Sequence, residues 1–449
     1  MIVRIQSTPV KDSGIPWIGE IPANWQVMRI ATLSNKITNG YVGATREIFV
    51  NEGIPYLQSL HIKENKIVFE PKYFVTYEWS QNHSKSILGE GDVLIVQTGG
   101  VGNVTVVNSE FVGANCHALI IVSTKGNIIT GNYLSWLFNS VYGLHSLKSI
   151  QTGALHPHLN CGDVRDIQIV IPPTNEQRAI ASFLDRKTAA IDTLIAKKQR
   201  LIQLLEEKRT ALINQAVTKG LNPNVPMKDS GIAWINKIPE HWEVSRLGFL
   251  STTIQTGPFG SQLHASEYVE NGIPLVNPIN IQRGNIIADY QKTVNQEVAI
   301  RLSRHKLLIG DLVFARRGEL GRCGVINKNN NGWLCGTGCI QVRFSKIKVD
   351  PDYLNLFISI PWVASWLSLE SVGSTMDNLN TEILSTLPII LPPKEEQIKI
   401  FQYIEFKKYL FDKLIMTIDT QINKLQEYRQ SLITAAITGK IDVEEEVAA

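Results

Sequence analysis

Apolar residues recur at helical spacing along two long stretches of the chain, residues 176–217 and 396–437. The spacings are mostly three, four or seven, which is the pattern of a helix with one apolar stripe. Neither stretch contains Gly or Pro, and a Pro pair stands just before each, where a helix start tolerates it. The pattern predicts two long helices that form a coiled coil. The predicted seam residues are Ile191, Leu194, Leu201, Leu205 and Leu212 in the first helix, and Phe411, Ile415, Ile418, Ile422, Leu425 and Leu432 in the second.

A helix of about forty residues, at 1.5 Å per residue, is a rod of roughly 60 Å. Such a rod cannot bury its stripe alone, and we expect the other helix to cover it. If the two halves of the chain are related by a two-fold axis, as pairs of like subunits usually are, the helices run antiparallel. The alternative is that each stripe packs on its own globular neighbour.

The stretches that precede the helices have a different pattern. Residues 26–170 (the first module) and 243–390 (the second module) contain short apolar runs such as DVLIV, HALIIV and DLVFA, separated by Gly, Asn and Pro. Such runs indicate buried strands. The predicted fold class is therefore α+β, with two pseudo-symmetric globular modules separated by a long antiparallel two-helix coiled coil. The predicted domains are residues 1–174, 175–219, 220–394 and 395–449.

The two halves of the chain also repeat each other motif by motif. KDSGIPWIGEIPANW at residues 11–25 returns as KDSGIAWINKIPEHW at residues 228–242, and we call these the opening motifs. LGEGDVLIVQTGGVG pairs with LIGDLVFARRGELG, and IPPTNEQ with LPPKEEQ, at offsets of 217 to 220 residues. So few insertions indicate one fold used twice. The sequence is nearly cyclic, so we expect the termini to lie close together, with each opening motif near the junction of a module with the helices.

Each opening motif contains two tryptophans, Trp17 and Trp25 in the first and Trp234 and Trp242 in the second. Because they occur twice, these residues are candidates for binding two copies of a partner. They are equally good candidates for core anchors of the modules, since buried aromatic side chains contribute much of the energy of a core.

Composition favours a globular protein of the cytoplasm. Hydrophobic residues make up 44% of the chain and charged residues 19%, which suits packed interiors. The first ten residues, MIVRIQSTPV, lack the apolar run of a secretory signal, and no stretch is apolar enough to span a bilayer. Five scattered cysteines form neither a disulfide framework nor the spacing of a zinc site.

Local charge favours nucleic-acid binding, unevenly in the two modules. Between Gly248 and Asp350 there are twelve Lys and Arg against seven Asp and Glu, whereas between Ala31 and Tyr133 there are seven against eight. Cationic side chains contact phosphates, and Arg, Asn or Gln on loops can read base edges. Any one of these residues could equally be an ordinary solvated loop residue. The candidate DNA-binding residues are Gln97, Thr98, Asn103, His156 and His158 in the first module, and Ser261, Gln262, His264, Arg316, Arg317 and Arg322 in the second.

The chain contains no motif that indicates catalysis. Ile171 and Leu391 precede the Pro pairs where an amino-methyltransferase would need Asn or Asp, and a Walker loop is absent. GGVGN at residues 99–103 looks like a cofactor loop, but its counterpart is GELGR and no acidic residue follows at the distance that would hold a ribose. A turn between strands explains it better. We therefore expect no catalytic residue, metal or cofactor on this chain.

Together, in the same order and twice, these motifs resemble the specificity subunits of Type I restriction-modification systems. The resemblance covers essentially the whole chain and rests on the two opening motifs, on GDVLIVQTG and GDLVFARRG, and on PPTNEQ and PPKEEQ. It implies a non-catalytic subunit with two target-recognition domains that binds double-stranded DNA and reads a bipartite sequence. It also implies two modification subunits and restriction subunits as partners, with S-adenosylmethionine, ATP and Mg bound by those partners.

Two unlike modules on a two-fold frame predict an asymmetric target whose two parts are separated by a spacer, and the helix length sets that spacer. Two other classes of protein stay open. One is a stand-alone pseudo-dimeric DNA-binding regulator, and the other is a coiled-coil scaffold that binds only protein.

Overall fold

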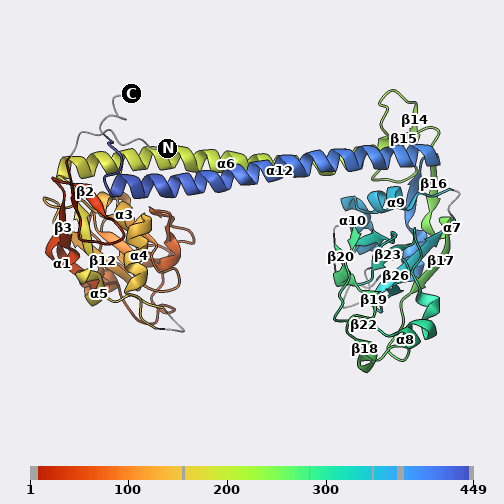
Figure 1. The fold of residues 1–449 in the computed structure, drawn as a ribbon, viewed down its shortest axis with the longest axis horizontal. Coiled ribbons are helices and arrows are strands. Elements are labelled where there is room, and N and C mark those ends of the chain that lie inside the picture. The colour runs from red at the N-terminus through yellow and green to blue at the C-terminus, as the bar shows by residue number, and fades with distance from the viewer. Residues whose placement is uncertain are drawn as a thin grey trace. The chain divides into compact units, whose positions relative to one another are not determined.

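The computed structural model describes residues 9–153, 157–282, 284–318, 320–345, 348–371 and 379–443. The chain divides into two compact units. Unit 1 is Met1–Gln199 with Asp419–Ala449, and unit 2 is Arg200–Ile418. Each unit contains one module and a part of each long helix, α6 (Thr174–Lys219) and α12 (Lys394–Ile437), which Figure 1 draws in yellow-green and blue. Among the described residues, no helix is both long and apolar enough to cross a membrane.

The first module is built on a four-stranded antiparallel sheet in the order β10-β9-β12-β4. The strands are β4 (Ser34–Asn39), β9 (Val93–Val96), β10 (Val104–Val106) and β12 (Leu119–Thr124). Alternate residues face two different cores. Val93, Ile95 and Ile120 pack with the helices α3 (Gly131–Asn139) and α4 (Val141–Ser149), whereas Leu94 and Ile121 pack against an outer layer. Because both faces are covered, the runs DVLIV and HALIIV are continuously apolar.

The outer layer of the first module contains a second, three-stranded sheet in the order β11-β5-β8. Its strands are β5 (Ile54–Leu57), β8 (Phe74–Val75) and β11 (Asn115–Cys116). The short elements of this module are α1 (Ile30–Leu33), α2 (Tyr77–Asn82), α5 (Cys161–Asp166), β6 (Ile62–Lys63) and β7 (Lys66–Ile67).

The second module repeats this architecture, with the sheet order β17-β26-β23-β24. Its main strands are β17 (Ser251–Thr256), β23 (Leu312–Ala315), β24 (Cys323–Val325) and β26 (Cys339–Phe344), with α9 (Pro351–Ile358) and α10 (Pro361–Glu370) against them. The outer sheet has β18 (Tyr268–Val269), β19 (Ile273–Val276), β22 (Thr293–Val294) and β25 (Leu334–Cys335). The short elements are α7 (Leu247–Leu250), α8 (Gln296–Arg301), α11 (Thr381–Thr386), β20 (Ile281–Gln282) and β21 (Asn285–Ile286). The predicted α+β class and the predicted repeat are thus confirmed.

A small strand pair connects each opening motif to the start of a long helix. In unit 1, β3 (Gln26–Arg29) pairs with β13 (Gln168–Ile171), and in unit 2, β16 (Glu243–Arg246) pairs with β27 (Pro388–Leu391). The opening motifs themselves form the hairpins β1 (Val10–Asp12) with β2 (Glu20–Pro22), and β14 (Met227–Asp229) with β15 (Lys237–Pro239).

The Glu-Gln pair after each Pro-Pro fixes the helix start to the module. Gln177 is fully buried, and its Oε1 accepts from the Thr130 N–H at 2.9 Å. Its Nε2 donates to Ile128 O at 2.8 Å and to Pro172 O at 2.9 Å. Gln397 makes the equivalent three bonds in unit 2. One buried amide side chain thus bonds to three backbone groups at the start of each long helix.

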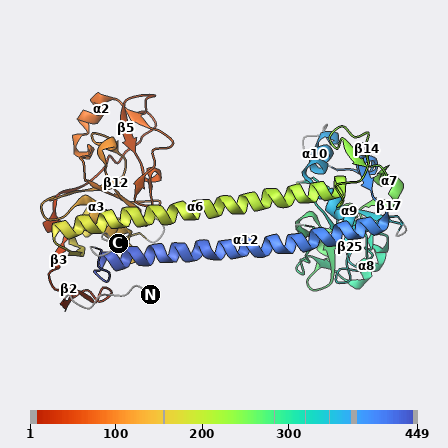
Figure 2. The ribbon, with the colours of Figure 1, turned by 90° about the horizontal axis from the view of Figure 1, so that it is seen from above.

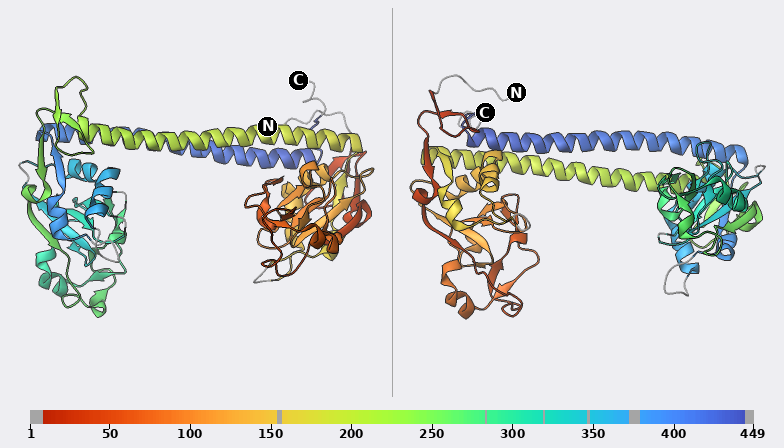
Figure 3. Two further views of the ribbon diagram at one scale, coloured as in Figure 1. Left: turned by 180° about the vertical axis from the view of Figure 1, so that it is seen from behind. Right: turned by 60° about the horizontal axis from the view of Figure 1, so that its bottom comes forward.

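The second tryptophan of each opening motif is a buried anchor at this same junction. Trp25 Nε1 donates to Glu176 Oε1, and Trp242 Nε1 donates to Glu396 Oε2, both at 3.0 Å. Trp25 is 1% exposed and Trp242 is fully buried. In unit 1 the end of α12 lies beside the ring of Trp25, since a Cβ on Gly439 would lie 3.2 Å from it. In unit 2 the end of α6 lies beside the ring of Trp242, since a Cβ on Gly220 would lie 3.2 Å from it. The expected cyclic junction is therefore present in unit 1, where the hairpin β1–β2 lies at the end of α12 (Figure 3).

The first tryptophan of each opening motif is more exposed. Trp17 is 56% exposed and its ring meets His145 edge-on, with 5.0 Å between ring centroids. Trp234 is 39% exposed and lies against the ring of Trp362. The two tryptophans of a motif therefore differ, since one is a core residue and the other presents part of its ring to the surface.

Within each unit the two helical segments lie side by side and run antiparallel (Figure 2). In unit 1, Lys198 Nζ donates to Gln421 Oε1 at 2.6 Å, and Arg429 Nε donates to Asp192 Oδ1 at 2.8 Å. In unit 2, Arg209 Nη1 donates to Asp412 Oδ1 at 3.0 Å. The first turns of α6 also join the core of the first module through Ile180, Phe183 and Leu184, among other residues, so the stripe is shared between the module and the other helix.

Two predicted seam residues of α6 are exposed, whereas all six predicted seam residues of α12 are buried or half-buried. On α6, Ile191 is buried and Leu205 and Leu212 are half-buried, but Leu194 and Leu201 are 43% and 44% exposed. The residues next to them, Ile195 and Ile202, are half-buried and take their places on the buried face of α6. The half-buried Lys198 stands between them, and this polar residue hides the true three-four spacing from a search for apolar residues. On α12, Ile418, Ile422 and Leu432 are buried, and Phe411, Ile415 and Leu425 are half-buried.

Candidate nucleic-acid interface

The same turn follows the central strand of each module. After β9, residues 97–103 return to β10 and the Val96 N–H donates to Asn103 O at 2.9 Å. After β23, the turn from residue 316 to residue 322 is closed by the equivalent bond from the Ala315 N–H to Arg322 O, also 2.9 Å. Both turns contain two glycines with positive φ, as such a tight return requires. The described parts of the two turns therefore share the closing bond and the two glycines, while the sequences are QTGGVGN in one turn and RRGELGR in the other.

A second loop lies against this turn in both modules. The Leu159 N–H donates to Gln97 O at 3.2 Å, and the Leu379 N–H donates to Arg316 O at 2.9 Å. In the first module this loop forms a bridge in which the Thr152 hydroxyl lies 3.2 Å from His158 Nε2. The structure thus brings Gln97 and the loop of His158 together, as candidate residues of one surface. His156 lies outside the described residues.

The second module adds a third loop, residues 257–264. Phe259 from this loop is 52% exposed, and the Arg316 guanidinium lies over its ring at 5.6 Å from the centroid. Arg316 Nε also donates to Leu379 O at 3.1 Å. Burial is the main cause that lowers the pKa of Arg316, and Arg317 beside it lowers that pKa further. Arg316 is therefore held by two loops, whereas Arg317 is exposed.

Three predicted residues of the third loop have more local roles. Gln262 Oε1 accepts from the Phe259 N–H at 3.2 Å, which closes the loop on itself. The His264 side chain caps a short helical turn, and Glu267 accepts from the His264 N–H at 2.7 Å. That bond, together with Arg301, lowers the pKa of Glu267. Ser261 is exposed, and so are Thr98 and Asn103 of the first module. Arg322 is half-buried and lies in the turn itself.

Aromatic residues of the first module near its Gly40 loop were missed by sequence reasoning. Trp79 and His83 stack at 3.9 Å between ring centroids, and Tyr41 meets both rings edge-on at 5.0 and 4.8 Å. In the second module Val298 holds the place of Trp79, since each is the residue whose N–H the N-cap side chain accepts. The one available signal was the Trp and His four residues apart, which is weak without a known helix.

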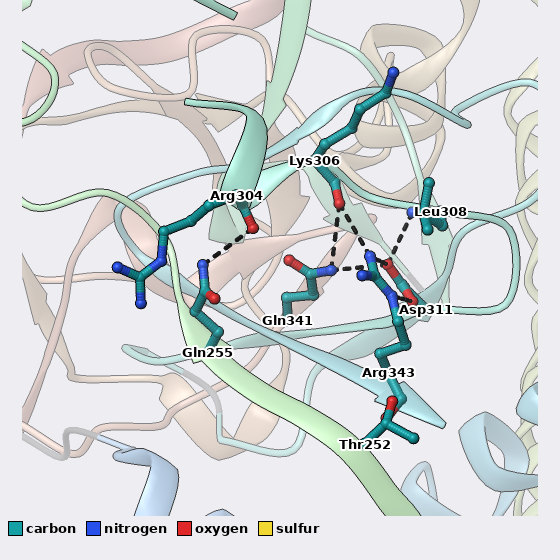
Figure 4. A network of polar contacts seen from close by, with 8 residues as sticks. All are labelled: Thr252, Gln255, Arg304, Lys306, Leu308, Asp311, Gln341 and Arg343. Carbon is teal, nitrogen blue, oxygen red and sulfur yellow. Dashed lines mark hydrogen bonds and ion pairs between the residues drawn. The ribbon is translucent and has the colours of Figure 1, made fainter. Parts of the chain in front are cut away.

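A buried carboxylate, that of Asp311, organises a network of polar side chains in the second module (Figure 4). Asp311 accepts from Arg343 Nη2 at 2.7 Å, from Gln341 Nε2 at 2.9 Å and from the Leu308 N–H at 2.8 Å. The bond to Asp311 raises the pKa of Arg343. The charge of Arg343 is thus paired with that of Asp311, and Arg343 is not counted among the cations that can contact phosphates.

The same network fixes backbone and leaves two cations outside it. Arg343 Nη2 donates to Lys306 O at 3.1 Å, and Gln255 Nε2 donates to Arg304 O at 3.2 Å. Only the carbonyl groups of Arg304 and Lys306 take part, and both side chains point away from the network (Figure 4). Both residues are exposed. Their positions are therefore set by buried bonds while their charges stay at the surface.

The described part of the chain has no group of three or more His, Cys, Asp or Glu placed to hold a metal ion. Each of the five cysteines is a free thiol, and burial raises the pKa of Cys335, so that it stays protonated.

The model of the Type I restriction modification DNA specificity domain matches the chain over residues 22–204 and 239–426. The EcoKI specificity subunit of Escherichia coli (strain K12) is 23% identical over 94% of this chain and 90% of that relative. The putative MjaX specificity subunit of Methanocaldococcus jannaschii is 24% identical over 99% of this chain and 100% of that relative. The match to the EcoBI specificity subunit of Escherichia coli, 23% identical, is shorter and spans 63% of this chain and 60% of that relative.

Two solved structures share the fold. One is a chain from a study of complex assembly and conformational transition of the type I R-M system, with a TM-score of 0.72 and 17% identity over 94% of this chain and 99% of that one. The other is the HsdS subunit from Thermoanaerobacter tengcongensis, with a TM-score of 0.57 and 18% identity over 94% of this chain and 98% of that one. Since the family model matches twice, once over each module, the chain belongs to the family of the Type I restriction modification DNA specificity domain.

Proposed function

We propose that this chain is the specificity subunit of a Type I restriction-modification enzyme and reads an asymmetric bipartite sequence in double-stranded DNA. The observation that supports this most is the repeated turn after β9 and β23, which has the same closing hydrogen bond and the same pair of glycines but two different sets of side chains. A common backbone gives the two modules the same way of approaching DNA. Different side chains give them different half-sites.

Contacts to the DNA backbone come from cations that the fold positions without neutralising them. Arg304 and Lys306 have this arrangement in the second module. Such contacts release counterions and hold the protein on the duplex without reading sequence. The first module, with seven Lys and Arg against eight acidic residues between Ala31 and Tyr133, contributes less of this attraction.

The long helices serve the target in a second way, because their length sets the spacer between the half-sites. DNA has a two-fold axis in its backbone, and a pair of like modules can contact one face of it about one helical turn apart, roughly 34 Å. Since the modules are unlike in sequence, the two half-sites differ.

The partners are two modification subunits and, through the complex, restriction subunits. Exposed apolar side chains on the helices support this, since apolar side chains that gather on one surface mark protein contacts. Leu194 in unit 1 and Leu414 in unit 2 stand at equivalent positions of α6 and α12 and are 43% and 45% exposed. One such site in each unit suits two copies of one partner. The chain itself has no catalytic role, and S-adenosylmethionine, ATP and Mg bind to the partners.

Exchange of one module tests this function. Residues 31–170 would be replaced by the corresponding module of another specificity subunit, and methylated adenines would be mapped in the genome by single-molecule sequencing. We expect one half-site to change and the other half-site and the spacer to stay. A chimera in which both half-sites change, or a wild-type protein that directs no methylation, contradicts the proposal.

A further inference from the structure

The first residue after the central strand occupies the same place in both modules. Gln97 follows β9 and Arg316 follows β23, and the carbonyl of each accepts the N–H of a leucine, Leu159 or Leu379, from the neighbouring loop. Both side chains therefore start from one backbone position with one direction. The modules therefore build this part of the turn in the same way but present different side chains, Gln97 or Arg316, to the DNA.

We propose that Arg316 is the residue of the second module that selects guanine, and that Gln97 is the matching base-selecting residue of the first module. This inference rests on the proposed function, since it requires that the modules read base pairs. The proposed function assigns a half-site to each module, whereas this inference assigns one base of that half-site to one residue.

The surroundings of Arg316 leave one end of its guanidinium for a ligand. The Nε atom donates to Leu379 O at 3.1 Å, and the ring of Phe259 faces the guanidinium at 5.6 Å. Among the described residues, neither Nη1 nor Nη2 of Arg316 has a hydrogen-bond acceptor. Two parallel N–H groups on a held plane match the O6 and N7 acceptors of guanine in the major groove, which is the commonest specific contact of Arg.

Rigid placement distinguishes this residue from its neighbour. A phosphate contact needs only a charge, and exposed Arg317 suffices for that. Arg316 is half-buried, and its side chain is fixed from two loops, so less side-chain entropy is lost when it binds. Such a fixed fork discriminates between bases because a wrong base leaves its N–H groups unpaired.

Gln97 offers a different pattern at the matching place. Its amide has a carbonyl acceptor and an NH₂ donor, and adenine presents an N6 donor and an N7 acceptor in the major groove. The first module should therefore prefer adenine where the second prefers guanine. The first module also accommodates Gln on this backbone, which shows that Arg316→Gln fits the turn.

The test measures binding of the full chain, in complex with its modification subunits, to duplexes that carry each of the four bases at every position of the wild-type target. The variants are Arg316→Gln, Arg316→Lys and, as the matched control, Arg317→Gln. We expect the wild type to prefer guanine at one position of the second half-site by about ten- to a hundredfold. Arg316→Gln should lose that preference and gain adenine there, while the first half-site is unchanged.

The two control variants separate base reading from charge. Arg316→Lys keeps the charge but not the fork, so it should bind with reduced preference at that one position. Arg317→Gln should weaken binding to all duplexes alike and lower the salt dependence by about one counterion. If Arg316→Gln weakens binding equally for all bases, or if the second half-site contains no guanine, the inference is wrong and the proposed function stands. A wild-type complex without any sequence preference overturns both.

Discussion

At the scale of single residues, the two modules use different side chains for the same structural task. His61 and Asn280 each close a short helical turn in the outer layer of their module. His61 Nδ1 accepts from the Gln58 N–H at 2.9 Å, and Asn280 Oδ1 accepts from the Asn277 N–H at the same distance. His61 is fully buried and Nε2 lies 2.8 Å from Pro71 O. The bonds require a neutral imidazole, whereas the amide of Asn280 does not titrate in this range.

This difference predicts that His61 makes the first module sensitive to acid. Burial lowers the pKa of His61 below its usual value. The free energy of unfolding is therefore highest at a pH well above the usual His pKa of about 6.5. It falls as the pH drops through that value, because the unfolded chain takes up the proton before the folded chain does. The loss is at most about 1.4 kcal/mol per pH unit. Thermal unfolding between pH 5 and 8 should show a smaller slope for His61→Asn, and equal slopes would contradict the prediction.

At the scale of elements, the helical segments are matched by ion pairs as well as by apolar contacts. Asp192 pairs with Arg429 in unit 1, and Asp412 pairs with Arg209 in unit 2. The repeat relates the two pairs to each other, since Asp192 corresponds to Asp412 and Arg209 to Arg429. A charge that must meet its partner disfavours a shifted alignment of the helices, which an apolar stripe alone would tolerate.

We expect the two ion pairs to differ in strength. The side chains of Arg429 and Asp192 are 16% and 25% exposed, whereas those of Arg209 and Asp412 are 32% and 61% exposed. Solvent screens the second pair more. Double-mutant cycles with alanine should give a coupling energy of about 1 kcal/mol for the first pair and less than half of that for the second. Urea denaturation followed by helix circular dichroism measures both, and a stronger Arg209–Asp412 coupling would refute this order.

At the scale of the whole molecule, one chain contains two copies of a module and two copies of a helix. Each unit includes the end of a helix that begins in the other unit. In unit 1 the last turns of α12, with Leu432, Ile433 and Ile437, enter the core that contains Trp25. In unit 2 the last turn of α6, with Val217, enters the core that contains Trp242. Duplication within one chain lets the modules diverge, which a homodimer cannot do, and so permits an asymmetric target.

The proposed role of the helices predicts that their length sets the spacer. Seven residues would be inserted in both helices, after Gln199 and after Ile418, so that the seam stays in phase. Two extra turns add about 10 Å, the length of about three base pairs. Methylation mapping should show both half-sites unchanged and a longer spacer. An insertion in α6 alone misaligns the seam and serves as the control, and an altered half-site would exclude the proposed role.

Much of the architecture could be predicted because it depends on patterns that are local in sequence. The helices follow from three-four spacing, the buried strands from short apolar runs, and the repeat from motifs such as PPTNEQ and PPKEEQ. The candidate turns follow from Gly-rich segments after a strand. Leu194 and Leu201 were misassigned to the seam because Lys198 interrupts the apolar stripe, and a pattern search cannot know that a lysine lies at a contact.

What the sequence alone determined is therefore the repeat, the α+β class, the two long helices and the set of loops that differ between the modules. Only the tertiary structure decided that the Glu and Gln of each Pro-Pro junction bind the opening motif and the module. It also decided that Arg316 contacts Phe259 and Leu379, while Arg343 forms an ion pair with Asp311. The physical reason is that these contacts join residues dozens to more than a hundred positions apart, and their energies depend on distance and burial, which no local pattern encodes.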